Sequence, residues 1–106
     1  MAFYIRQNDT SPALVATLTD YNDNPINLTG ATVRLHVKDF SGTIKVDSLC
    51  TITAATLGRI SYAWVVGDTD TPGTYYLEFE ATYSDNSVET FPNKGNLSLV
   101  VTKELN

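Results

Sequence analysis

This sequence has one cysteine, one histidine, few basic side chains and no long apolar run. The lone Cys50 cannot form an intramolecular disulfide. Seven Lys and Arg residues stand against twelve Asp and Glu, which gives a formal net charge of −5. Duplex binding needs clustered cations that displace counterions, and these are scattered, so we expect no nucleic-acid partner. No apolar run approaches the ~20 residues of a membrane span, so we expect no membrane partner either.

The first residues and the length of the sequence indicate where the chain is made and how many domains it forms. Residues 1–10 carry neither the basic start nor the long apolar stretch of a secretory signal. Together with the single cysteine, this predicts synthesis in a reducing cytoplasm. The 106 residues suit one domain with an adequate core, and no linker or internal repeat divides them. We therefore expect a single domain over residues 1–106.

Alternation of apolar and polar residues with a period of two is the main pattern present. In residues 31–38, Val, Leu and Val alternate with Arg, His and Lys. One apolar face and one charged face are typical of a half-buried strand in an antiparallel sheet. Further strands are expected at Phe3–Gln7, Ala13–Thr19, Thr43–Asp47, Leu49–Thr53, 58–64, Tyr75–Tyr83, Val88–Phe91 and Leu97–Thr102.

Eight or nine strands at intervals of about eight to twelve residues, without a helical period, predict an all-β fold. We expect an antiparallel, immunoglobulin-like β-sandwich. In that fold a tyrosine hydroxyl bonds to backbone a few residues upstream, and Tyr75 follows Pro72 and Gly73 in the matching place. The residues expected in the core share the apolar strand faces: Leu14, Leu18, Val33, Leu35, Ile44, Ile60, Tyr62, Trp64, Leu77, Phe79, Leu99 and Val101.

Oxygen ligands gather in one loop, at Asp20, Asn22, Asp23 and Asn24. Calcium loops have similar spacing, but the glycine of such loops and the bidentate glutamate at their end are both missing here. Asx residues also form turns by bonding to their own backbone. We favour the turn interpretation, both here and for the two aspartates in 68–70.

Other reactive side chains are few. Glu78 and Glu80 lie two apart on one strand face, with carboxylates roughly 7 Å apart from the strand rise. Paired carboxylates can do acid–base chemistry when one is desolvated, but a solvated face is commoner. His36 lies on a polar strand face, and Cys50 alternates with Ile52 as a small buried hydrophobe. We expect no enzyme, no catalytic, cofactor-binding or metal-ligating residue, and no cofactor.

The order of the motifs resembles the N-terminal immunoglobulin-like domain of phage baseplate upper proteins. The opening of that family is matched by Leu18-x-Asp20 followed by Pro25-x-x-Leu28-x-Gly30-Ala31-x-Val33-x-Leu35-x-Val37. The later matches are Gly58–Tyr62, Asp70–Tyr75 with Glu78-Phe79-Glu80 beyond it, Val88–Pro92 and Leu97–Val101.

The resemblance implies a structural component of a bacteriophage virion, a tail or baseplate accessory or adaptor protein. In that family the domain joins host-attachment parts to the baseplate. The implied partners are other baseplate, tail or capsid proteins, and the implied location is the virion after synthesis in the host cytoplasm. A capsid decoration protein and a carbohydrate- or calcium-binding adhesion module remain alternatives.

Contacts with these partners are expected at strand edges and loops. Open edges can add a strand from a neighbour, and residues 3–7, residues 97–102 and the loop 21–25 are the candidates. The net charge of −5 repels copies of the chain from one another. We therefore expect weak or assembly-dependent self-association.

Overall fold

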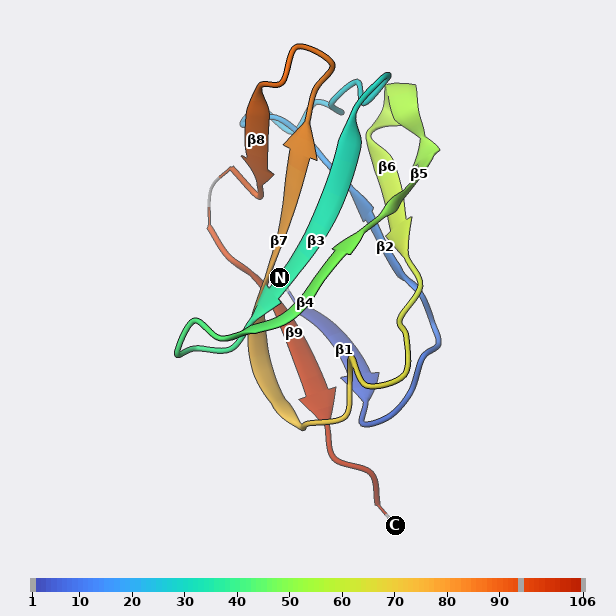
Figure 1. The fold of residues 1–106 in the computed structure, drawn as a ribbon, viewed down its shortest axis with the longest axis vertical. Helices are drawn as coiled ribbons and strands as arrows, with labels where there is room; N and C mark the ends of the chain where they lie inside the picture. Colours follow the sequence, from blue (N-terminus) through green and yellow to red (C-terminus); the bar gives the residue numbers. More distant parts are fainter. Residues whose placement is uncertain (1, 94, 106) are drawn as a thin grey trace.

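Nine strands and one short 3-10 turn form two facing sheets in the computed structural model, which describes residues 2–93 and 95–105 (Figure 1). The all-β sandwich of eight or nine strands is confirmed. In the described parts of the chain, no helix has both the length and the apolar composition that a membrane crossing requires. The elements are β1 (Ala2–Arg6), β2 (Leu14–Thr17), β3 (Thr32–Lys38), β4 (Ile44–Leu49), β5 (Thr51–Ala54), η1 (Ala55–Leu57), β6 (Arg59–Tyr62), β7 (Gly73–Thr82), β8 (Val88–Phe91) and β9 (Leu97–Thr102).

The larger sheet has the strand order β1-β9-β7-β3-β4, and the smaller sheet has the order β2-β6-β5. Strands β8 and β9 share one side of β7: β9 pairs with its first half, Gly73–Leu77, and β8 with its second half, Phe79–Thr82. Figure 1 shows them one above the other along β7. The described residues of the connection between β8 and β9, 92–93 and 95–96, therefore lie near the middle of this side of the sheet.

One strand pair departs from the antiparallel arrangement, because β1 and β9 run parallel. Parallel neighbours need a long connection between them, and the first and last strands of the chain satisfy this condition. The same pairing corrects an expectation about the edges. β1 is an edge strand as predicted, but residues 97–102 lie between β1 and β7 in the sheet interior, so their prediction as an open edge is wrong.

The core lies between the two sheets and contains all but one of the residues predicted for it. The exception is Ile44, whose exposed fraction is 55%. The register shifts at a bulge, so that Val37 pairs with Val46 whereas Lys38 pairs with Ile44. The extra residue in β4 moves Ile44 to the polar face beside Lys38. Val46 stays in the core.

The core also contains residues that were not predicted, some on alternating strand faces and others in a connection or at a strand end. Leu28, fully buried in the connection between β2 and β3, is the main example. Its N–H donates to the carbonyl oxygen of Ala55 at 2.8 Å, which fastens the connection to η1. The other members of this group are Ile5, Val37, Val46, Tyr75, Ala81 and Phe91.

Two local features fix the turns of the sandwich. The hydroxyl of Tyr75 donates to the carbonyl oxygen of Thr71 at 2.6 Å, which confirms the predicted tyrosine corner. Gly58 ends η1 with φ +66°, a left-handed conformation that favours glycine. Its carbonyl accepts a hydrogen bond from the Leu18 N–H at 2.7 Å, so this turn holds the end of β2.

Candidate docking surfaces

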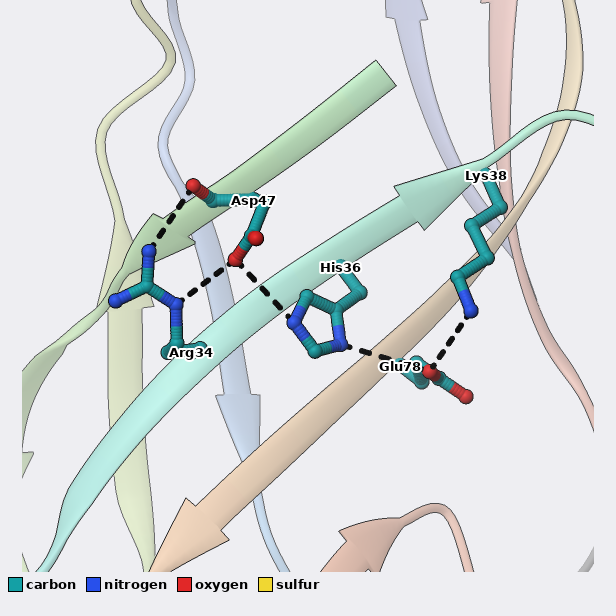
Figure 2. Close-up of polar contacts among 5 residues, drawn as sticks. All are labelled: Arg34, His36, Lys38, Asp47 and Glu78. Atoms are coloured by element: carbon teal, nitrogen blue, oxygen red, sulfur yellow. Dashed lines mark hydrogen bonds and ion pairs between the residues drawn. The ribbon is translucent and has the colours of Figure 1, made fainter. Parts of the chain in front are cut away.

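The outer face of the larger sheet carries a row of polar and charged side chains centred on His36. This residue of β3 is in register with Asp47 of β4 and with Glu78 of β7. Its Nε2 lies 3.3 Å from Asp47 Oδ1 and its Nδ1 lies 3.5 Å from Glu78 Oε1. Figure 2 shows the ring between the two carboxylates. The imidazole therefore lies between carboxylates from both neighbouring strands.

Two cations, Arg34 and Lys38, flank the imidazole. Arg34 Nε donates to Asp47 Oδ1 at 2.8 Å, and its Nη2 donates to the Asp47 carbonyl oxygen at 3.2 Å. The hydrogen bond from Arg34 lowers the pKa of the Asp47 carboxyl. Lys38 Nζ lies 3.8 Å from Glu78 Oε1 (Figure 2). Exposed pairs of this kind add little stability, so their main effect is to fix the charge pattern of this face.

The two glutamates singled out in the sequence belong to this face and have separate partners. Glu78 lies opposite His36, whereas Glu80 lies opposite Arg34. Both are partly exposed. The solvated-face interpretation is thus confirmed, and each carboxylate faces a potential cation on β3. His36 is less exposed than expected, since only 16% of its side chain is accessible.

An aromatic patch adjoins the charged row. The ring centroids of Phe40 and Tyr76 are 4.7 Å apart, and their exposed fractions are 64% and 44%. The exposed Ile44 and Tyr76 both lie opposite Lys38, on either side of β3. Phe40 was not predicted as part of a contact surface, although it stands beside Ser41 and Gly42 in an expected turn, where an aromatic side chain is exposed.

The acidic loop after β2 is a turn. Oδ1 of Asp20 accepts the backbone N–H groups of Asn22 at 2.8 Å and Asn24 at 3.0 Å. These hydrogen bonds, with that from Asn24 the strongest cause, lower the pKa of the Asp20 carboxyl. Across the described residues, no three His, Cys, Asp or Glu side chains converge as a metal-binding group. The turn interpretation is confirmed for this loop.

The aspartates of the later loop are also engaged. Asp68 Oδ2 accepts the hydroxyl of Tyr62 at 2.6 Å and the N–H of Val65 at 3.0 Å. Asp70 forms an ion pair with Lys45. These contacts tie the connection between β6 and β7 to neighbouring strands.

Cys50 is half-buried against the core. It was expected to be a buried hydrophobe. Burial raises the pKa of its thiol to about 11. Since the thiolate is the nucleophilic form, this environment disfavours reactivity.

A groove of about 640 Å³ opens between the sheets on the side formed by β2 and by the connection from β8 to β9. All four residues of β2 line it. The loop that follows β2 forms part of its rim, with Asp20 and Asp23. Apolar side chains from both sheets line its interior: Phe3, Leu14, Leu18, Phe79, Phe91 and Leu97.

The fold is similar to a known sandwich. The crystal structure of CopC from Methylosinus trichosporium OB3b superposes with a TM-score of 0.54 and 11% sequence identity, covering 97% of this chain and 85% of that one. At this identity the likeness concerns the fold alone. No curated protein sequence matches this chain significantly.

A family model supplies the sequence relationship. The model described as BppU N-terminal domain matches residues 2–103. That match spans all nine strands of the sandwich. The chain therefore belongs to the family of baseplate upper protein N-terminal domains, and it is a structural protein of the virion associated with the phage baseplate.

Proposed function

We propose that this protein is an adaptor or accessory protein of the baseplate or tail, which acts by holding other virion proteins together and not by catalysis. The observation that carries the proposal is the family match over residues 2–103. In this role the domain links host-attachment parts to the baseplate. Its contribution is a rigid sandwich with surfaces that can be covered by neighbours.

The two surfaces described above support a contact role. Interface cores are enriched in aromatic residues and Arg, and the outer face offers Phe40, Tyr76 and Arg34 on adjacent strands or their connections. The groove adds an apolar recess beside an edge strand. By contrast, the carboxylates of Asp20 and Asp68 are occupied by hydrogen bonds from their own surroundings. This favours the adaptor role over a calcium-binding module.

Self-association is expected to be weak away from the particle. Copies of a chain with a net charge of −5 repel one another at long range, so the symmetry of the assembly comes from the docking partner. Light scattering of the purified protein at micromolar concentration should give a monomer or a weak oligomer. A stable trimer or hexamer would show that the chain forms the symmetric unit by itself.

Fractionated virions test the proposal. Purified particles of the phage that encodes this chain are separated into heads and tails, and the protein is quantified by mass spectrometry in each fraction. We expect recovery with the tails, in a constant ratio to the major tail proteins. Recovery with the heads would favour capsid decoration instead, and absence from both fractions would contradict a structural role in the particle.

A further inference from the structure

The open edge of β2 borders the groove. Within the described residues β2 pairs with β6 alone. The Leu18 N–H donates to the Gly58 carbonyl, one step beyond the pair of Thr17 with Arg59. Backbone hydrogen bonds alternate along an antiparallel pair. The N–H and C=O groups of Thr17 and Val15 therefore point away from β6, toward the open side.

These outward groups are available for pairing. No hydrogen bond to the backbone of Val15 or Thr17 comes from any described residue outside β6. The side chain of Val15 is 67% exposed, whereas that of Leu14 is almost fully buried. A strand edge with free N–H and C=O groups is a template for another strand. Here that template is four residues long, roughly 13 Å of strand.

The groove supplies what a bare edge lacks, namely a place for side chains. Successive side chains of a strand point to opposite faces, so a strand added to β2 would turn every second side chain toward the sandwich interior. The apolar lining there includes Phe79 and Phe91, which are buried in the core of the opposite sheet. Backbone pairing then gives affinity and the groove gives selectivity for apolar side chains, as in other strand-addition complexes.

The charge at the rim of the groove distinguishes a second copy of this chain from a basic segment of another protein as its occupant. Asp20 and Asp23 are the charged residues among the described residues that line the groove. Asp20 is held ionised by the backbone hydrogen bonds that lower its pKa. A second copy of this chain would bring a further net charge of −5 to an acidic rim. A partner segment with a basic side chain at this end is complementary to it.

From these observations we infer that β2 is completed by an extended segment of another virion protein. The segment adds to the open edge at Val15 and Thr17, seats alternate apolar side chains in the groove, and sets a lysine or arginine beside Asp20 and Asp23. This inference rests on the proposed function, and it names the surface and the chemistry of the partner that the adaptor holds.

A proline substitution at the edge tests the inference in the assembled particle. Val15→Pro removes an outward N–H and places the proline ring in the path of the added strand, while the pairing of β2 with β6 keeps its hydrogen bonds. Val15→Ala is the matched control, since it shortens the same exposed side chain and keeps the N–H. Each variant replaces the wild-type gene in the phage. Its copy number per purified particle is measured by mass spectrometry, and its fold is checked by circular dichroism and thermal melting.

We expect the copy number of Val15→Ala per particle to equal that of the wild type. The copy number of folded Val15→Pro should be at least about tenfold lower, because a tenfold loss of binding corresponds to one lost hydrogen bond in a buried interface. Asp23→Asn keeps the turn but removes a rim charge, and its incorporation should decrease and lose part of its salt dependence. Equal incorporation of folded Val15→Pro and Val15→Ala would overturn the inference. Absence of the wild-type chain from particles would instead overturn the proposed function, and the inference with it.

If Val15→Pro does not fold, a photo-crosslink from β2 tests whether another virion protein lies beside this strand. The photo-crosslinker p-benzoyl-phenylalanine replaces Thr17, intact particles are irradiated, and the joined peptides are sequenced. The expected product joins this chain to a different virion protein, at a segment of alternating apolar residues with a Lys or Arg within a few positions. A crosslink to a second copy of this chain, or to no protein at all, would overturn the inference.

Discussion

Gly58 provides the sharpest test of how the sandwich is held together. It adopts φ +66°, and a Cβ built on it would lie 2.5 Å from the Leu18 carbonyl oxygen and 2.9 Å from that of Ile26. Both contacts are with backbone atoms, so no side-chain movement relieves them. The Leu18 carbonyl also accepts the N–H of Ile26 at 2.9 Å. Alanine at this position must therefore displace the end of β2 and the loop that follows it.

The expected loss of stability has two parts. A left-handed conformation costs a non-glycine residue about 1–2 kcal/mol. Displacing the Leu18 carbonyl adds about 1–3 kcal/mol for a disrupted backbone hydrogen bond. Gly58→Ala should thus lower the free energy of unfolding by about 2–5 kcal/mol, and the melting temperature by roughly 8 °C or more at about 4–8 °C per kcal/mol.

Gly30→Ala is the matched control, because Gly30 has φ +76° but its Cβ would meet only Ser84 Cβ at 3.7 Å, an ordinary contact. It should show the conformational cost alone, about 1–2 kcal/mol. Urea denaturation of the two variants and the wild type gives both values. If Gly58→Ala costs no more than Gly30→Ala, the close approach of the β2 end to this turn is refuted.

Two further predictions concern the register of β4 and the acidic loop. Because the bulge turns Ile44 outward, Ile44→Ala should change the free energy of unfolding by less than about 0.5 kcal/mol. Val46 stays in the core, so Val46→Ala should cost about 2 kcal/mol. Urea denaturation of both variants measures these values, and the reverse order would contradict the register. Because the folded-state pKa of Asp20 is lowered from 3.8, its stabilising contribution is present above that pH and is lost as the pH falls below it. Asp20→Asn should therefore lose less stability than the wild type as the pH is lowered through this range. If the melting temperatures of the two proteins fall in parallel with decreasing pH, the turn contacts of Asp20 are contradicted.

Most of the fold could be predicted from the sequence because strand faces are a local property. In 31–38 the alternation alone sets which side chains are buried. The tyrosine corner at Tyr75 was equally local, since the hydroxyl reaches backbone four residues upstream. Where the expectation failed, the cause was non-local. The bulge that exposes Ile44 depends on the pairing of β4 with β3, and no pattern within β4 itself reports it.

The candidate surfaces were less predictable for the same reason. His36, Asp47 and Glu78 lie far apart in the sequence, and only the register of three strands brings them into one row. The groove joins residues from Ala2 to Leu97 through the parallel pairing of β1 with β9 and the position of β8. The acidic loop could be interpreted from sequence, because an Asx turn is closed by its own backbone.

Cryo-electron microscopy of the phage tail can show whether this domain is docked at the baseplate in contact with other virion proteins. The domain measures 46 × 25 × 22 Å between its Cα extremes, so it is recognisable as a sandwich at subnanometre resolution. We expect copies of this sandwich at the baseplate, arranged by the baseplate symmetry and in contact with other virion proteins. Particles whose baseplate contains no such domain, or which carry it only on the capsid, would contradict this expectation.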